Sequence, residues 1–157
     1  MFDDFQADIK RFIATKQKPF LYLLLTEQRL WALAEYRFSS WISSKVHIPV
    51  IRRILRSIGF IWHKLIEIIT GIDLPCRAKI GKGLYIGHFG GIFIFTDVVM
   101  GQYCNISQGV TIGIGGRGED SGCPTLGDRV FIGAGAKVIG KINIGNNVAI
   151  EVNPVVT

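Results

Sequence analysis

The sequence predicts an α+β fold: an α-helical N-terminal domain over residues 1–70, then a parallel β-helix with one protruding loop over residues 71–157. Three observations support this prediction. A period of six residues governs the second part of the chain, whereas apolar residues recur at helical spacing in the first part. Composition also changes between the two parts, because residues 2–70 hold all three Trp and few of the 19 Gly.

The period of six begins at Ile80, breaks in a Gly-rich segment, and resumes out of phase at Leu126. Such a period is typical of a parallel β-helix built from hexapeptide units, in which each stepped side chain points inward and stacks on its equivalent in the next coil. A β-sandwich, the alternative, does not keep a register of six. The stepped residues are all apolar, and eleven of the twelve are Leu, Ile or Val: Ile80, Ile86, Ile92, Val98, Cys104, Val110, Leu126, Ile132, Val138, Ile144, Ile150 and Val156.

The break in the period, between Thr111 and Pro124, is rich in glycine. Loops inserted into repeat proteins usually project from one face and contribute to binding, so we expect this one to protrude and to bind a ligand. It lacks the Lys-Ser/Thr ending of a phosphate-binding P-loop. The chain ends at Thr157, one residue past a stepped position, and we expect the natural protein to continue beyond it.

Three or so helices are predicted for the N-terminal domain. Asp3 and Asp4, followed by Lys10 and Arg11, indicate the start of a first helix, with acids early and bases later. From 20 to 43 apolar residues recur at spacings of three and four, which predicts one amphipathic helix with an aromatic face. Pro49 precedes a third helical run at 51–69.

The third run combines aliphatic residues with Arg52, Arg53, Arg56 and Lys64. Such a helix packs its apolar face on neighbouring helices or on a second subunit, which is the interpretation that we favour. The alternative is a peripheral contact of residues 50–70 with an anionic membrane surface. We interpret His47 and His63, which fall in this domain, as structural or surface histidines.

Composition narrows the partners and the compartment. The net charge of +6 and the pI near 9.4 suit an anionic partner, such as a nucleotide-bearing cofactor or an anionic lipid surface. No nucleic-acid-binding motif is present, so we predict no nucleic-acid partner. The three cysteines are unpatterned, and the acidic N-terminus lacks the basic head of a secretory signal. No apolar run reaches the length of a membrane span. We therefore expect a cytoplasmic protein. Any contact that it makes with a membrane should be at the inner face.

One histidine, His88, lies in the β-helix. It follows the stepped Ile86 by two residues, so its side chain is not committed to the interior. Asp73 precedes it by 15 residues, and a coil of three hexapeptides spans about 18 residues, so the two should lie on neighbouring stretches of wall. A carboxylate that accepts from one imidazole nitrogen makes the other nitrogen a base. The alternative is a surface histidine flanked by glycines.

Several motifs of the β-helix resemble those of the hexapeptide-repeat acyltransferases. The resemblance is densest over residues 71–157 and points to the serine O-acetyltransferase family with its polysaccharide-acetylating relatives, such as the colanic acid acetyltransferases. The segments that carry it are residues 73–81, with the sequence DLPCRAKIG, Gly87-His88, residues 109–113, residues 132–137 and residues 140–145.

The resemblance implies a left-handed β-helix, homotrimers with active sites between adjacent subunits, and a helical domain through which two trimers could pair. Acetyl-CoA would be the acyl donor, and no metal is expected. His88 matches the family's catalytic base and Asp73 its carboxylate partner. Ala134 matches a position whose backbone contacts acetyl-CoA, and Gly113 and Gly115 would contribute contacts from the edge of the loop.

Two departures from the serine acetyltransferases bear on the acceptor. Gly87 stands where that family has an acidic residue before the histidine, and Gly122-Cys123 replaces an Arg-His pair. Without these charges a zwitterion would enter the pocket unpaired, which is costly. We therefore expect a saccharide hydroxyl as the acceptor, with serine as the alternative. A non-catalytic scaffold is a second alternative, which the Asp73–His88 pair argues against. Cys104 is predicted to be core, and Cys123 a small wall residue rather than a nucleophile.

Overall fold

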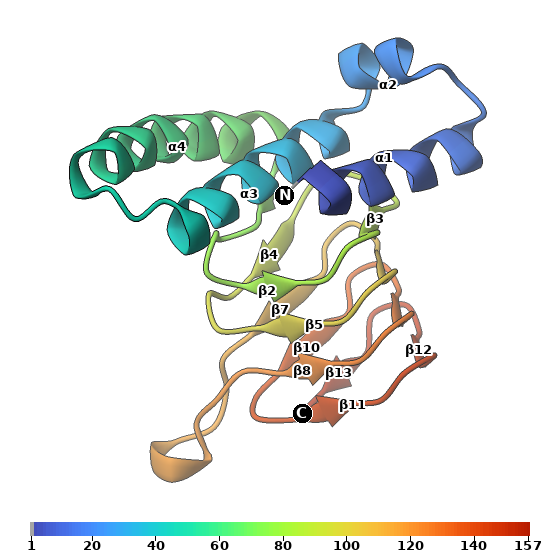
Figure 1. The fold of residues 1–157 in the computed structure, drawn as a ribbon. Coiled ribbons are helices and arrows are strands. Elements are labelled where there is room, and N and C mark those ends of the chain that lie inside the picture. The colour runs from blue at the N-terminus through green and yellow to red at the C-terminus, as the bar shows by residue number, and fades with distance from the viewer. Residues whose placement is uncertain (1) are drawn as a thin grey trace.

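The computed structural model describes residues 2–157. Within them, four α-helices form the first part of the protein. Figure 1 shows them lying across one end of a β-helix. Helices α3 and α4 pack along each other, and α1 and α2 both contact α3. None of the helices in the described chain is both long enough and apolar enough to span a membrane. Their bounds are α1 Phe2–Lys16, α2 Phe20–Thr26, α3 Gln28–Lys45 and α4 Pro49–Thr70.

The prediction of a single helix over residues 20–43 is wrong, because the structure breaks it at Glu27. This residue has extended backbone angles (φ −100°, ψ 93°) and caps both α2 and α3. The apolar spacing of three and four continues across the break, so the pattern gave no sign of it. Helix α1 begins with the predicted acids Asp3 and Asp4, and α4 begins at Pro49 and ends against Gly71 in the left-handed conformation (φ 63°).

Thirteen short strands follow, and all their pairings are parallel. They form three walls, each made of strands that recur once per coil: β1-β4-β7-β10-β13, β2-β5-β8-β11 and β3-β6-β9-β12. The strands are β1 Ile72–Asp73, β2 Lys79–Ile80, β3 Tyr85–Ile86, β4 Ile92–Ile94, β5 Val99–Met100, β6 Asn105–Ile106, β7 Thr111–Gly113, β8 Thr125–Leu126, β9 Phe131–Ile132, β10 Lys137–Ile139, β11 Asn143–Ile144, β12 Ala149–Ile150 and β13 Val155–Val156.

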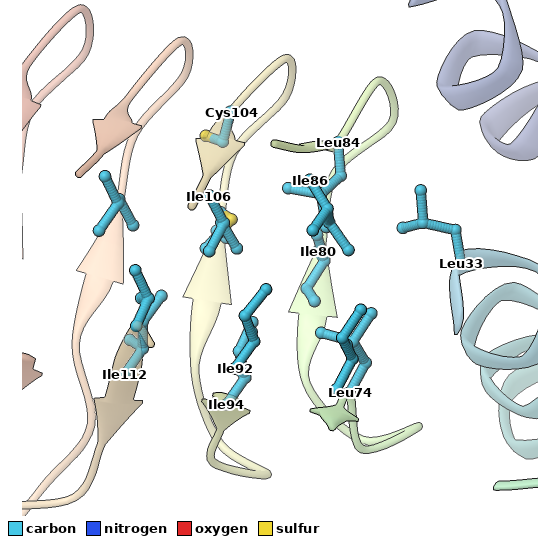
Figure 2. Close-up of a cluster of buried hydrophobic side chains, with 14 of the residues drawn as sticks. Leu33, Leu74, Ile80, Leu84, Ile86, Ile92, Ile94, Cys104, Ile106 and Ile112 are labelled. Carbon is cyan, nitrogen blue, oxygen red and sulfur yellow. The ribbon is translucent and has the colours of Figure 1, made fainter. Parts of the chain in front are cut away.

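The interior of the prism is the stack of side chains that the period of six predicted. Ten of the twelve stepped residues are buried, while Ile144 and Val156 are half-buried. The stacking register differs from the predicted one in the first coils, because Ile80 and Ile86 pair with Met100 and Ile106 and not with the stepped Val98 and Cys104. Ile106 pairs in turn with Ile132. Figure 2 shows such residues as columns along the axis, with Leu33 of α3 facing the first coil. No coil buries its apolar face alone, so stability rests on this stacking.

The predicted loop projects from the β-helix between β7 and β8 (Figure 1). An antiparallel bridge between Gly115 and Gly122 closes its neck, and the 3₁₀-helix Gly118–Asp120 forms its tip. Fold class is therefore confirmed: an α+β protein with an N-terminal helical region and a left-handed parallel β-helix that carries one protruding loop.

Arginine and tyrosine side chains join the helices to the first coil. Carbonyl groups of that coil face the helices instead of another coil, and unpaired buried carbonyls are costly. Arg37 donates to the carbonyls of Ile80 and Gly81, both at 2.7 Å. The hydroxyl of Tyr36 donates to the carbonyl of Ala78 (2.8 Å). The helices therefore act as a polar cap on the open end of an apolar prism.

Candidate active site

Asp73 lies on β1, the first strand of the β-helix. Its neighbours Ile72 and Leu74 are buried in the prism, so the alternation of a strand turns the Asp73 side chain outward. The register places Asp73 beside Phe93 of β4 in the next coil. The carboxylate is half-buried at the junction between the helices and the coils.

His88 lies just after β3, on the edge between the wall of β3 and the wall of β4. Its side chain is exposed and has no hydrogen-bond partner within residues 2–157. The amide of Gly87 donates to the carbonyl of Ile106 (2.8 Å), which fixes the backbone directly before the histidine. Gly90 and Gly91, with positive φ of 97° and 65°, then turn the chain into β4. The imidazole is thus carried on a fixed backbone and is open to a ligand.

Asp73 and His88 belong to the same coil, but no hydrogen bond or ion pair joins them in the described chain. The amide of Ile92 donates to the carbonyl of Gly71 (3.0 Å), which brings the segment after His88 alongside the start of β1. Neighbouring stretches of wall therefore carry the two residues. Their pairing for catalysis stays a prediction, and in the single chain the Asp73 carboxylate has another partner.

That partner is His63 of α4. Its Nε2 lies 3.3 Å from Oδ1 of Asp73, and its Nδ1 lies 3.0 Å from Oε2 of Glu35 of α3. Two carboxylates therefore hold one imidazole, and hydrogen bonds to Asp73 and Glu35 raise its pKa from 6.5 to about 10. Sequence analysis missed this cluster, because no periodicity spans the three separate elements that supply its members.

Arg29 of α3 holds the backbone immediately before His88. Its Nη1 donates to the carbonyl of Ile86 at 3.1 Å and also to the carbonyl of Gly87. Its Nη2 is paired with the carboxylate of Glu27. The side chain is only 5% exposed, and its burial lowers its pKa below the usual arginine value. A guanidinium with fixed, forked donors thus anchors the turn that presents His88.

Ala134 shares the edge of the prism that carries His88. Amides of Gly87, Ser107 and Gly133 donate to the carbonyl groups of the next coil in series, so these positions are equivalent. Ala134, which follows Gly133, therefore lies two coils along from His88 on the same edge. Its carbonyl accepts from the amide of Asn153 (2.8 Å). The edge therefore runs along the backbone of successive coils from His88 to Ala134.

The two loop glycines predicted to contact acetyl-CoA lie at the loop's base. Gly113 ends β7, and its carbonyl accepts from the amide of Gly140 (3.0 Å). Both backbone groups of Gly115 are bonded to Gly122, each at 3.0 Å, so they close the neck of the loop. Gly115 can therefore shape the loop but does not have a free amide to offer a ligand. A Cβ at Gly115 would stand 2.7 Å from the side chain of Ile139, which explains why glycine is needed there.

Two cysteines of the β-helix, Cys104 and Cys123, are poorly suited to covalent catalysis. Cys104 is buried in the core as predicted, and burial raises the pKa of its thiol. Burial also raises the pKa of the half-buried Cys123. Within residues 2–157, no group of three or more His, Cys, Asp or Glu side chains is arranged to hold a metal ion.

The chain is similar to known proteins in both sequence and structure. No family model matches the chain. The fold is shared with solved serine acetyltransferases. A serine acetyltransferase from Synechococcus elongatus is 38% identical over 138 residues, which cover 87% of this chain and 52% of the relative.

Solved structures agree with this result. Serine acetyltransferase from Neisseria gonorrhoeae in complex with serine superposes with a TM-score of 0.79 at 26% identity, covering 99% of this chain and 61% of that one. A serine acetyltransferase in complex with CoA gives a TM-score of 0.77 at 27% identity, covering 98% and 60%. The chain spans about half the length of the curated relatives that it matches. All three of these matching proteins are serine acetyltransferases.

Proposed function

We propose that the protein is an acetyl-CoA-dependent O-acetyltransferase and that serine is its acceptor. The observation that carries this proposal is the exposed, unpartnered imidazole of His88 on an edge that Arg29 anchors and that continues to Ala134. The similarity to serine acetyltransferases, including structures in complex with serine and with CoA, supports both the donor and the acceptor.

The reaction needs one base and one acyl donor. An alkyl hydroxyl is too weakly acidic to attack at neutral pH unless its proton is removed during the attack. His88 takes that proton while the hydroxyl oxygen bonds to the thioester carbonyl carbon. The tetrahedral intermediate then collapses, the C–S bond breaks, and the sulfur of CoA takes the proton from the His88 imidazolium. Asp73 would hold the imidazole in the tautomer that this step requires.

We place acetyl-CoA along the edge from His88 to Ala134, with the loop at its side. Gly113 and the loop neck at Gly115 would shape the wall of this groove. The net charge of +6 suits the negatively charged phosphates of the donor. We also propose a homotrimer, in which a neighbouring subunit closes the other side of the groove. Sedimentation of the purified protein would test the trimer, and a monomer with full activity would contradict it.

A saccharide hydroxyl is the second candidate acceptor, because two specific positions favour it. Gly87 and Gly122-Cys123 offer no charge to a zwitterionic amino acid. A sugar needs neutral hydrogen-bond partners and would not suffer from this lack.

The test compares acceptors and one variant. Release of the CoA thiol is followed with acetyl-CoA plus serine, and with acetyl-CoA plus a panel of saccharides. Release of CoA that requires serine supports the proposal, whereas release with a saccharide and not with serine would identify a saccharide as the acceptor. Loss of the base should lower kcat by about 10²- to 10⁴-fold in His88→Ala. His47→Ala, a remote exposed histidine, is the matched control. Equal rates in all three proteins would overturn the mechanism.

We also propose that α4 lies on an anionic membrane at its cytoplasmic face. Ile51, Ile54, Ile58, Ile61, Leu65 and Ile68, spaced by three and four residues, leave an exposed aliphatic stripe on α4. Arg53 and Arg56 line a hollow of about 570 Å³ beside it. If two copies of α4 packed against each other, their arginines would face arginines. The one acid of α4, Glu67, could not neutralise them, because it is already paired with Lys64 (2.5 Å). An anionic lipid surface satisfies both features.

Flotation with phosphatidylglycerol-containing vesicles tests this contact. Arg53→Gln/Arg56→Gln should lose most of the binding, whereas Arg77→Gln/Arg129→Gln, with the same charge change on the coils, should keep it. Equal flotation of the two variants, or no flotation of the wild type, would overturn the membrane contact.

A further inference from the structure

The cluster around His63 connects three elements at the top of the β-helix. Glu35 comes from α3, His63 from α4 and Asp73 from β1, and the two carboxylates bind opposite nitrogens of the ring. Ser39 donates to the other oxygen of Glu35 (2.6 Å), so that carboxylate is held from two sides. The order of contacts is therefore Ser39, Glu35, His63, Asp73, with Asp73 at the end that faces the first coil.

The electrostatics explain why the ring is charged. Glu35 is 2% exposed, and a carboxylate buried without a cation is costly. The charged groups that face the imidazole are Glu35 and Asp73, while Arg56 and Arg77 line the cavity of about 650 Å³ beside it. With a pKa of about 10, His63 is an imidazolium at neutral pH and donates from both nitrogens.

We propose that His63 is a positioning residue for Asp73 in acyl transfer. It fixes Oδ1 of Asp73, which leaves Oδ2 to accept from the imidazole of His88. This inference rests on the proposed function, since it gives Asp73 a task only if His88 acts as a base. The helical cap then does more than close the prism, because it supplies the outer end of a Glu35–His63–Asp73–His88 series.

A tethering role alone would not need this arrangement. Arg37 and Tyr36 already join α3 to the first coil through backbone carbonyls, whereas His63 contacts Asp73, one of the two side chains that the sequence assigned to catalysis. The ring of His63 contacts both carboxylates and therefore links Glu35 to Asp73.

The kinetic test uses His63→Gln, which keeps a polar side chain of similar reach and removes the charge. We expect kcat per folded molecule to fall about tenfold to thirtyfold, with the KM for acetyl-CoA unchanged within about twofold, since His63 acts on the base and makes no contact with the donor in this proposal. Loss of the cation beside Asp73 should also shift the pH profile of kcat. Glu35→Gln should shift it in the same direction but less, and His47→Gln should match the wild type. A fall in Tm with wild-type kcat and pH profile would overturn the proposal.

A second measurement does not depend on activity. Imidazole resonances followed by NMR should show His63 titrating near pH 10 in the wild type and at clearly lower pH in Asp73→Asn. Because this folded pKa lies above the ordinary value, the stabilisation is fully present below about pH 6.5 and is lost as the pH rises through about 10. A normal His63 titration refutes the cluster even if His88→Ala is inactive. An abnormal titration in a protein without transferase activity refutes the proposed function and, with it, the positioning role, while the ion cluster stands.

Discussion

The helical cap and the β-helix are stabilised by different interactions. Inside the β-helix the contacts are aliphatic stacks and parallel backbone ladders, repeated from coil to coil. The cap instead buries charged groups, among them Asp8, Arg29, Glu35 and Arg37. Stacking adds similar increments at each coil, whereas a buried charge depends on a few specific partners. The β-helix, which has a visible repeat, should therefore lose stability gradually as residues are changed, whereas the cap should fail at single positions.

The largest effect is expected at the Asp8–Arg37 pair. Asp8 is fully buried and accepts from Arg37 Nε (2.9 Å), from Arg37 Nη2 (3.1 Å) and from the amide of Leu84 (2.9 Å). Burial raises the pKa of Asp8 in spite of Arg37. Asp8→Ala leaves a buried guanidinium short of its counter-ion and should cost about 3–5 kcal/mol in urea unfolding.

The exposed pair Arg77–Asp97, at 3.3 Å, is the matched control for this variant. Its side chains are largely in water, so Asp97→Ala should cost less than about 1 kcal/mol. Similar losses in the two variants would contradict the contrast between a charge-dependent cap and a surface ion pair.

A core truncation tests the other side of the comparison. Ile132 is fully buried and lies in register between Ile106 and Ile150, so Ile132→Ala opens a cavity in the stack. We expect a loss of about 3 kcal/mol in urea unfolding. Phe131→Ala, at the exposed neighbouring position of the same strand, should cost much less. A larger loss at Phe131 would mean that an unseen surface covers the outer face of that wall.

The β-helix could be predicted from the sequence because its repeat is local and periodic. Each stepped residue reports the inward direction of its own coil, and a Gly-rich break such as that before Pro124 reports a loop. Handedness came from the resemblance, since a period of six is the same for either hand. The break at Glu27 was not predicted, because the apolar residues keep their spacing of three and four across it. That spacing alone cannot distinguish one long helix from two helices joined at a kink.

The candidate site was predictable only in part, for the same physical reason. His88 was a candidate because it is the one histidine of the β-helix and its side chain is not committed to the interior, whereas its role as base and the choice of Ala134 came from the family resemblance. Arg29 and His63 act through contacts that span 58 and 10 positions between different elements, and no local pattern records such a contact. Buried polar networks depend on tertiary geometry, so sequence alone gives their members and not their pairing.

An intermediate effect is expected where the two regions meet. The buried hydroxyl of Tyr36 donates to the carbonyl of Ala78 and accepts from the amide of Ile80 (3.0 Å). Tyr36→Phe leaves both backbone groups unsatisfied and should cost about 2 kcal/mol in urea unfolding. Tyr22→Phe, on an exposed turn of α2, is the control and should be neutral. A neutral Tyr36→Phe would mean that water replaces the hydroxyl at the junction.

The smallest expected change separates positioning from stability at the turn that presents His88. Arg29→Lys keeps the positive charge near Glu27 but replaces a planar fork by a single ammonium, which cannot hold the carbonyls of Ile86 and Gly87 in the same geometry. We expect kcat to fall about tenfold, equivalent to about 1.4 kcal/mol in the barrier, with the KM for acetyl-CoA unchanged. Arg11→Lys, which loosens a similar contact to the carbonyls of Gly83 and Cys104 away from His88, should leave kcat at the wild-type value. If both lysine variants reduced kcat equally, the cap would act on the prism as a whole, and the specific anchoring of His88 by Arg29 would be wrong.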